Sequence, residues 1–274
     1  MPRHSGARPV RKTARPIAHY PRKRFGQHFL ADRAVLKRIV DAIDPLPGQC
    51  LLEIGPGRGA LTAPLIERAG RLSAIEIDRD LIAGLRGRFP PEKLQLLEAD
   101  ALHFDYALLP EDLRVVGNLP YNISTPLLFR LCEFATRFRD LHFMLQKEVV
   151  ERMAARPSTA HYGRLTVMLQ HWFSVTRLFN VPPGAFRPPP KVDSAVVRLL
   201  PRTAAERGDV DVAALRRVVT AAFSQRRKTI GNALSTLFDP DRLAALGVDA
   251  MARAENLSLA DYVRLARSLS SASR

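Results

Sequence analysis

The sequence predicts an α/β protein in which a largely parallel sheet, flanked by helices, is followed by a small all-helical C-terminal domain. Between about residues 22 and 200, short apolar runs alternate with segments whose apolar residues have helical spacing. A glycine-rich turn directly follows the first of these apolar runs. Strands that alternate with helices in this way are typical of a doubly wound, Rossmann-like sheet.

Six apolar runs are the expected strands, because each is short and bounded by polar or turn-forming residues. They cover residues 50–54, 72–77, 94–98, 115–117, 141–146 and 195–200. The expected helices between them include residues 31–43, 125–134 and 149–155.

The pattern changes after the last expected strand. Pro201 and a charged stretch lead into segments with only helical apolar spacing, as at Val212, Leu215 and Val218. We therefore expect three parts, namely a basic flexible tail at residues 1–21, a Rossmann-like domain at residues 22–205 and a helical domain at residues 206–274.

The charge balance predicts a polyanionic partner. Lysines and arginines number 42 against 27 acidic residues, which gives a formal net charge of +15, and a basic surface attracts nucleic acid. Residues 1–24 carry eight of the basic residues and no acid. Prolines at positions 2, 9, 16 and 21 break the amphipathic helix that an organellar transit peptide needs, so a flexible tail that touches RNA is favoured.

Cysteine content and hydropathy exclude several classes of protein. Cys50 and Cys132 form no CxxC pair and lie among apolar residues, which indicates buried thiols rather than a disulfide scaffold or a zinc site. The same scarcity argues against methylation through a cysteine adduct on a pyrimidine. No apolar run is long enough to span a bilayer, and neither a signal peptide nor a heptad pattern is visible. We expect a cytoplasmic, monomeric protein without a membrane or metal partner.

The turn after the first expected strand is suited to a nucleoside cofactor. Gly55, Gly57 and Gly59 lack the side chains that would block a close approach to the backbone. Gly55, Gly57 and Ala60 also fit the loose dinucleotide pattern GxGxxG/A, so the turn alone does not separate S-adenosylmethionine from NAD. A Walker phosphate loop is excluded, because no Gly-Lys-Ser/Thr follows.

Two acidic residues at strand ends complete the expected cofactor site. Glu76 lies at the end of the second strand, where a carboxylate can accept hydrogen bonds from both ribose hydroxyls. Asp100 follows the third strand and is placed to accept from an adenine amino group. For each acid, capping of the next helix is the alternative interpretation.

The segment Asn118-Leu119-Pro120-Tyr121, after the fourth strand, indicates the chemistry. The amide oxygen of Asn118 and nearby backbone carbonyls can accept both hydrogens of an exocyclic amine and draw its lone pair toward a methyl sulfonium. Pro120 removes a competing backbone donor, and Tyr121 offers a face on which an extruded base can stack. No strong base is needed, because the proton can leave after the transfer. A turn that merely ends a strand is the alternative.

Five segments, in the right order, closely resemble the KsgA/RsmA ribosomal RNA adenine dimethyltransferases. They are residues 24–30 (RFGQHFL), 53–59 (EIGPGRG), 118–124 (NLPYNIS), 186–194 (FRPPPKVDS) and 223–229 (FSQRRKT). The resemblance covers about residues 22–274, and residues 1–20 share nothing with it.

The resemblance implies an S-adenosylmethionine-dependent enzyme that dimethylates each of two adjacent adenosines in the 3′-terminal hairpin loop of 16S ribosomal RNA, within the immature small ribosomal subunit. Tyr121 and Phe186 are implied on opposite sides of the target base, although a Phe in a Pro-rich loop otherwise packs in a core. The implied cofactor contacts are His28, Leu30, Gly55, Glu76, Asp100 and Asn118, and the implied catalytic residues are Asn118, Leu119, Pro120 and Tyr121.

A basic run in the C-terminal domain is the expected RNA contact. Arg226, Arg227 and Lys228, on an expected helix, would bind phosphates and set orientation rather than read bases. A solvated helix face is the alternative. Gly231 stands where the resemblance leads us to expect another basic residue, which removes a charge and lowers helix propensity.

Other functions stay open on the sequence alone. A related enzyme could act on the large subunit, as the resistance dimethylases with a similar turn do. Methylation of DNA adenine or of a protein glutamine uses similar chemistry, but resembles this chain over the catalytic turn only. A nucleic-acid-binding factor without catalysis is disfavoured because Gly55, Glu76, Asp100 and Asn118 are intact. An NAD enzyme is least favoured, because nothing resembles a hydride-transfer site.

Overall fold

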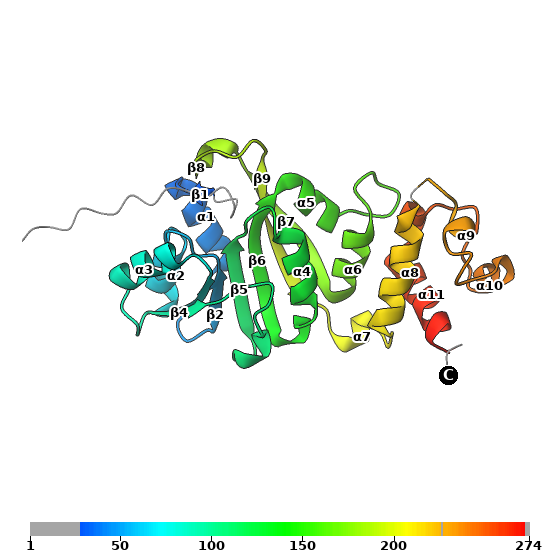
Figure 1. Ribbon diagram of the computed structural model, residues 1–274, viewed down its shortest axis with the longest axis horizontal. Coiled ribbons are helices and arrows are strands. Elements are labelled where there is room, and N and C mark those ends of the chain that lie inside the picture. Colours follow the sequence, from blue (N-terminus) through cyan, green and yellow to red (C-terminus); the bar gives the residue numbers. More distant parts are fainter. Residues whose placement is uncertain (1–27, 226, 272–274) are drawn as a thin grey trace, which may run out of the picture.

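The structure is a computed structural model that describes residues 28–225 and 227–271 (Figure 1). The expected basic tail, residues 1–21, and Arg226 of the basic run lie outside the described residues. In Figure 1 the sheet and its helices form one end of an elongated molecule, and helices from the C-terminal part of the chain form the other. Within the described ranges, no helix is long and apolar enough to cross a membrane.

A seven-stranded sheet in the order β4-β3-β2-β5-β6-β9-β7 forms the centre of the larger part. The neighbouring strands β4, β3, β2, β5 and β6 are parallel to one another. Strand β9 runs antiparallel to both of its neighbours, β6 and β7. All six expected strands are present, which confirms the predicted doubly wound α/β fold. The strands are β2 Leu51–Ile54, β3 Leu72–Glu76, β4 Leu94–Glu98, β5 Leu113–Asn118, β6 Phe138–Gln146, β7 Phe173–Val181 and β9 Ser194–Pro201.

Edge strand β7 has no counterpart among the expected strands. Its register against β9 shifts between Arg177 and Phe179, as in a β-bulge. The shift interrupts the alternation of apolar and polar residues from which a strand is predicted. The short strands β1 Phe29–Leu30 and β8 Phe186–Arg187 pair antiparallel in a separate two-stranded sheet, and they are too short to leave any pattern in the sequence.

Helices cover both faces of the large sheet. One face packs against α1 and α2, where Ile39 and Leu65 share a core with Val116 and Met144 of the strands. The other face packs against α4, α5 and α6. The bounds are α1 Arg33–Ile43, α2 Thr62–Ala69, α3 Arg79–Arg88, α4 Ser124–Cys132, α5 Lys147–Met153 and α6 Arg164–Trp172.

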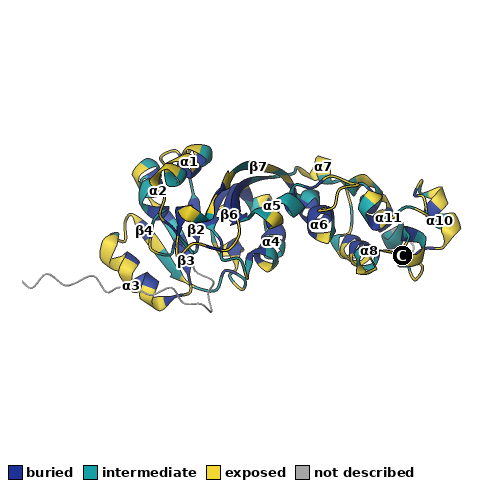
Figure 2. Ribbon diagram, turned by 90° about the horizontal axis from the view of Figure 1, so that it is seen from above, coloured by how far each residue is buried: buried dark blue, intermediate teal, exposed yellow. Residues whose placement is uncertain are grey.

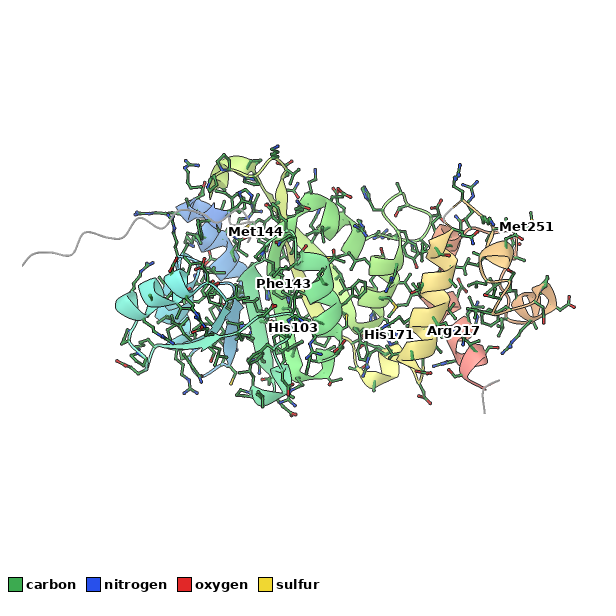
Figure 3. The ribbon with its side chains drawn as sticks, viewed as in Figure 1. His103, Phe143, Met144, His171, Arg217 and Met251 are labelled. Carbon is green, nitrogen blue, oxygen red and sulfur yellow. The ribbon has the colours of Figure 1, made fainter. Side chains whose placement is uncertain are left out.

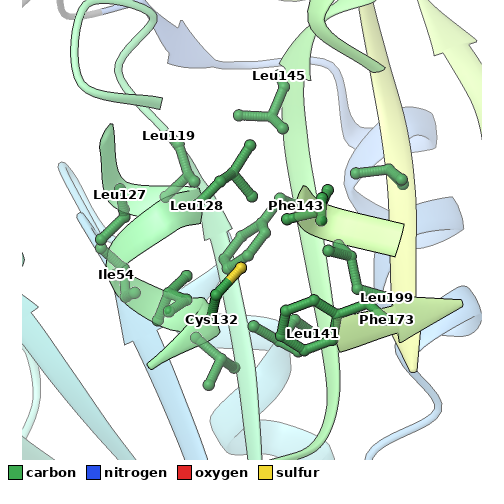
Figure 4. Close-up of a cluster of buried hydrophobic side chains, with 14 of the residues drawn as sticks. Ile54, Leu119, Leu127, Leu128, Cys132, Leu141, Phe143, Leu145, Phe173 and Leu199 are labelled. Carbon is green, nitrogen blue, oxygen red and sulfur yellow. The ribbon is translucent and has the colours of Figure 1, made fainter. Parts of the chain in front are cut away.

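The core between β5, β6 and α4 holds the expected catalytic turn in place (Figure 4). Leu119, the second residue of that turn, belongs to this core and is 1% exposed. Burial of its side chain fixes the turn to the sheet through the hydrophobic effect. Cys132 of α4 lies in the same core, where burial raises the pKa of its thiol, so the expectation of a buried thiol is confirmed there. Cys50 is partly exposed.

The C-terminal helices pack around a core of their own, which also takes in Val167 and Met168 of α6. Figure 2 shows this group beyond the sheet, at the end of the molecule opposite to α3. The expected boundary between residues 205 and 206 falls within α7, and the division into domains stays a prediction. The helices are α7 Ala204–Arg207, α8 Val212–Ser224, α9 Ile230–Ala233, α10 Pro240–Ala245 and α11 Leu259–Ser271.

A buried ion pair joins β5 to β6. Arg114 donates from Nε and Nη2 to the two carboxylate oxygens of Asp140 at 3.0 and 2.8 Å, and the two side chains are 7% and 4% exposed. The same guanidinium donates to the backbone carbonyls of Ile43 and Asp44 and to the side chain of Gln49. Because the last carbonyls of a helix lack partners within it, Arg114 satisfies the end of α1 and holds that helix on the sheet.

Two buried histidines make the fold sensitive to acid. Burial lowers the pKa of His142 in β6 and of His171 in α6 from 6.5 to about 4. Figure 3 labels His171 near the junction between the sheet and the C-terminal helices. Between pH 6.5 and about 4, the unfolded chain binds a proton at each histidine that the folded chain does not bind. The free energy of unfolding therefore falls as the pH is lowered through this window.

Chemical denaturation of the wild type and of His171→Leu between pH 7 and pH 5 checks this effect. Below pH 6.5 we expect the wild type to lose up to about 1.4 kcal/mol per pH unit more than the variant. Burial raises the pKa of Glu53 to about 7, which lowers stability as the pH rises from 4.5 to 7, but this contribution is common to both proteins and cancels in the difference. Identical pH slopes for the two proteins would contradict the prediction.

Candidate active site

A cavity of about 520 Å³ opens at the carboxyl ends of β2, β3 and β5. The glycine turn and the Asn118 turn face the same space, as expected for ligands bound at the carboxyl edge of an open sheet. Nine residues expected at the site line this cavity, namely His28, Leu30, Gly55, Glu76, Asp100, Asn118, Leu119, Pro120 and Tyr121.

The glycine turn leaves room at the cavity wall. Gly55 has a φ of 68° and Gly57 a φ of 58°, in the left-handed region that favours glycine. No protein atom lies within 4 Å of the position that a Cβ would take at Gly55, so a side chain there would fill open space. At Gly57 a Cβ would lie 3.2 Å from the ring of Phe29, so the missing side chain lets the β1 segment close over the turn.

Glu76 is positioned by backbone amides on two sides. Its Oε1 accepts from the N–H groups of Ile77 and Asp78 at 2.9 and 3.0 Å, and its Oε2 accepts from the N–H of Gly57 at 3.3 Å. The residue is 7% exposed, and burial raises the pKa of its carboxyl. A carboxylate has about four lone pairs, so one remains after these three bonds, on a group held at the cavity wall. This arrangement fits a carboxylate that accepts from a ribose.

Asp100 caps a turn and also lines the cavity. Its Oδ1 accepts from the N–H of Leu102 at 2.9 Å, which caps the turn after β4. Its Oδ2 lies 2.9 Å from Nδ1 of His103. The side chain is 36% exposed and also lines the cavity. Capping therefore fixes a carboxylate that can still accept from an amino group in the cavity.

Asn118 is oriented by a hydrogen bond to a residue 90 positions earlier in the chain. Its Nδ2 donates to the backbone carbonyl of His28 at 3.0 Å. With the amide nitrogen bonded in this way, Oδ1 is left as an acceptor for a ligand. The preceding Gly117 allows β5 to lie close to β2, because a Cβ there would be 2.6 Å from the carbonyl oxygen of Ile54.

Tyr121 is held between His28 and Ser194. The Tyr121 hydroxyl lies 2.7 Å from Oγ of Ser194, and its ring stacks on the ring of His28 with centroids 5.7 Å apart. Nδ1 of His28 lies 3.0 Å from the carbonyl oxygen of Pro188. Burial raises the pKa of Tyr121, so its hydroxyl stays protonated near neutral pH. The ring is therefore fixed beside the Asn118 turn before any base arrives.

Phe186 does not reach the cavity wall. It is 0% exposed and belongs to the core beneath α1, where it pairs in register with Leu30. The expectation that it stacks against the target base is not supported by this arrangement, and core packing describes it. The next residue, Arg187, lines the cavity instead, because successive strand residues point to opposite sides.

Two buried polar residues at the cavity were missed by the sequence analysis. Glu53 is 2% exposed, accepts from the hydroxyl of Thr62 at 2.6 Å and lines the cavity. An acid in an apolar strand that leads directly into a glycine turn is a signal that could have revealed it. His142, on β6, also lines the cavity, and no local pattern marks it.

Arg227 and Lys228 of the basic run lie outside any helix, so their placement on a helix was wrong. Helix α8 ends at Ser224, and the backbone N–H of Lys228 donates to the carbonyl of Gln225 at 2.8 Å. Arg227 and Lys228 are exposed there. Gly231 packs against a neighbouring backbone, because a Cβ would lie 3.1 Å from the carbonyl oxygen of Ala250. A side chain at this position would need the neighbouring backbone to shift by a few tenths of an ångström, a restriction that the sequence does not reveal.

Comparison with known proteins identifies the family. The profile of the ribosomal RNA adenine dimethylase family matches residues 18–271. The chain belongs to this family. It is an S-adenosylmethionine-dependent enzyme that dimethylates adenine N6 in ribosomal RNA, which confirms the expected cofactor and chemistry.

Curated relatives align with most of this chain and over most of their own length. Proteins named ribosomal RNA small subunit methyltransferase A, from Thiobacillus denitrificans and Aromatoleum aromaticum, are 61% and 59% identical to the chain. The alignments cover 89% and 90% of this chain and 96% and 93% of the relatives.

Solved structures share the arrangement beyond the catalytic turn. A dimethyladenosine transferase from Plasmodium falciparum has a TM-score of 0.76 at 29% identity, over 87% of this chain and 96% of that one. The 23S rRNA methyltransferase ErmE has a TM-score of 0.67 at 28% identity, over 88% and 99%. Such coverage disfavours the alternatives in which only the catalytic turn is shared, namely DNA adenine and protein glutamine methylation.

Replacement of Glu76 is expected to weaken cofactor binding. Hydrogen bonds to a charged acceptor contribute about 1.5–3 kcal/mol each, so Glu76→Ala should lower the affinity for S-adenosylmethionine about 10²-fold in calorimetry and leave RNA binding nearly unchanged. Glu98→Ala is the matched control, because Glu98 also ends a strand but pairs with Arg79 outside the cavity. Equal affinities in the two variants would count against a ribose role for Glu76.

Proposed function

We propose that this enzyme dimethylates the N6 amines of two adjacent adenosines in the 3′-terminal hairpin loop of 16S ribosomal RNA, within immature small ribosomal subunits in the cytoplasm. The observation that carries the proposal is a single cavity lined both by the group Gly55, Glu76 and Asp100 and by the turn from Asn118 to Tyr121. Because one chain contributes both groups, one chain suffices for the reaction.

The first group suits the cofactor, which when bound supplies an electrophilic methyl on a sulfonium. Glu76 would accept from a ribose hydroxyl through its remaining lone pair, and Asp100 from the adenine amino group. Gly55 leaves open space where a side chain would obstruct the nucleoside. Leu30 of the short strand β1 and His28 directly before that strand line the same cavity, and Phe29 between them closes over the glycine turn.

The second group suits an exocyclic amine. Oδ1 of Asn118 accepts one amine hydrogen, because its Nδ2 is already committed to His28. The carbonyl of Pro120 accepts from the N–H of Ile123 at 3.2 Å, so the carbonyl of Leu119 is the better acceptor for the second hydrogen. Two acceptors of this kind direct the nitrogen lone pair away from the purine ring and stabilise the positive charge that develops on nitrogen.

Tyr121 suits the face of the extruded base. Its ring is already fixed by Ser194 and His28, so stacking, worth about 1–3 kcal/mol, requires little further ordering. Catalysis then consists mainly of positioning, because the amine, two acceptors and the aromatic face are held in one geometry before the transfer. The proton leaves the amine after the methyl group has been received.

The choice of the small subunit is supported by the relatives. Those named small subunit methyltransferase A reach 61% identity, whereas ErmE, named for the 23S RNA of the large subunit, has 28%. Arg227 and Lys228, exposed after the end of α8, are proposed to contact RNA phosphates outside the cavity.

Mass spectrometry of RNA after incubation with purified protein and isotopically labelled S-adenosylmethionine tests the proposal. With undermethylated small ribosomal subunits, we expect two dimethyladenosines in one fragment from the 3′ end of 16S RNA. Large subunits serve as the matched control and should remain unlabelled. Labelling of large subunits alone would overturn the choice of substrate, and binding without any labelling would favour a factor that lacks catalysis.

A further inference from the structure

A second depression, here called the junction groove, lies where α4 and α6 meet α8. It has a volume of about 300 Å³, and its lining includes Phe129 and Arg130 of α4, Glu133 directly after α4, Arg164 of α6 and Arg216 of α8. The three helices lie side by side in both Figure 1 and Figure 2. The groove therefore lies at the boundary between the sheet part of the molecule and the C-terminal helices.

The charges of the junction groove do not cancel. Arg130 pairs with Glu133 and donates to the carbonyl of Phe104 at 3.2 Å, so this arginine is neutralised and held in place. Arg164 and Arg216 are exposed, and neither guanidinium forms a hydrogen bond or an ion pair with another residue of the described chain. Two positive charges are thus left available for an anionic ligand.

The junction groove also offers an aromatic face. Cζ of Arg164 lies 5.6 Å from the centroid of the Phe129 ring, which is partly exposed, and Met168 lies buried below. Contact with the ring orders a guanidinium at the groove without neutralising it. Guanidinium groups beside an aromatic face match phosphates that alternate with flat bases and riboses, as in a single-stranded nucleic acid.

The junction groove begins next to the active-site cavity. Ile123 lines the cavity, and Pro126, three residues later on the first turn of α4, lines the groove. From Pro126 to Glu133 the helix rises about 10 Å at ~1.5 Å per residue. That length corresponds to about three nucleotides at ~3.4 Å each. A strand that leaves the cavity can therefore follow α4 toward α8.

We propose that the junction groove binds the sugar-phosphate backbone of the substrate RNA a few nucleotides away from the target adenosine. Arg164 and Arg216 contact phosphates, and Phe129 packs against a ribose or a base. The contact positions the RNA without reading its sequence, because it involves no base edges. The inference rests on the proposed function, which supplies a structured RNA as the substrate.

The test is the salt dependence of RNA binding by the full chain. Each phosphate contact on a single strand contributes about 0.7 to the slope of log K against log salt, so the double variant Arg164→Gln, Arg216→Gln should flatten the slope by about 1.4. We expect its affinity for undermethylated small subunits to fall about tenfold, whereas the affinity for S-adenosylmethionine stays unchanged. The variant Arg164→Lys, Arg216→Lys keeps both charges and should retain most of the slope.

A matched control removes two arginines elsewhere. Arg38 also lies over an aromatic ring, that of Phe179, and Arg86 is exposed on α3, so Arg38→Gln, Arg86→Gln makes the same change in net charge. A slope for the junction-groove variant equal to that of this control would overturn the proposal. A loss seen with intact subunits but not with protein-free 16S RNA would also overturn it, because the partner would then be a ribosomal protein.

The two hypotheses can fail separately. Binding of the arginine variants decides the role of the junction groove, whether or not any methyl group is transferred. Methyl transfer by the wild type to the same subunits decides the proposed function. A wild type that binds with a groove-dependent slope but methylates only large subunits would overturn the proposed function alone.

Discussion

Asn118→Ala is expected to slow methyl transfer severely while leaving the binding of RNA nearly intact. The change removes the amide oxygen that accepts from the target amine, and loss of one preorganised hydrogen bond to a developing charge lowers kcat about 10²- to 10³-fold. It also frees the carbonyl of His28, so a small loss of cofactor affinity should accompany the loss of rate. Single-turnover methylation of small subunits, with separate measurement of RNA and cofactor binding, checks both effects.

Two further variants make this experiment specific. Asn118→Asp keeps an oxygen at the site but places a carboxylate against the carbonyl of His28, so it should be nearly as inactive as the alanine variant. Asn180→Ala removes an exposed asparagine from edge strand β7 and should retain full activity. Full activity in Asn118→Ala would rule out the proposed hydrogen bond from the target amine to Asn118.

Asp140→Asn is expected to destabilise the fold more than the removal of one charge from any of the more exposed ion pairs. Removing one partner of a buried pair leaves the other charge uncompensated, which lowers the free energy of unfolding by about 3–5 kcal/mol. Arg114, its partner, is 7% exposed and also holds the end of α1. Chemical denaturation of the purified protein measures the loss.

The matched control is a second Asp–Arg pair, formed by Asp112 directly before β5 and Arg139 of β6. Asp112 accepts two hydrogen bonds from Arg139, but these side chains are 62% and 46% exposed. Exposed pairs contribute about 0–1 kcal/mol, so Asp112→Asn should change stability little. Comparable losses in the two variants would show that burial of the Arg114 pair does not govern its contribution.

The sheet could be predicted from the sequence because its parallel strands are short, apolar and punctuated by turns. The glycine turn, Glu76, Asp100 and the Asn118 turn each follow such a strand, and carboxyl ends of parallel strands lie at one edge of a sheet. The order of strands and turns along the chain was therefore enough to predict that these residues lie close together. Edge strand β7 was not predicted, because the bulge between Arg177 and Phe179 interrupts the alternation of apolar and polar residues along it.

Long-range contacts mark the limit of such predictions. The hydrogen bond from Asn118 to His28 and the close approach of Gly231 to Ala250 depend on how distant segments pack, and no local pattern encodes them. Phe186 is a further example. The family resemblance implied a position against the target base, but the pairing of β8 with β1 buries this side chain in the core. Arg227 and Lys228 likewise lie in a turn that follows an early end of α8.

A crystal structure with S-adenosylhomocysteine bound tests the central claim most directly. The account predicts a ribose hydroxyl on Glu76, the purine amino group near Asp100, and the sulfur facing the side of the cavity formed by Asn118. It also predicts an opening between that sulfur and the ring of Tyr121, wide enough for a second purine. A cofactor whose sulfur points away from Asn118, or whose binding fills the space beside Tyr121, would contradict it.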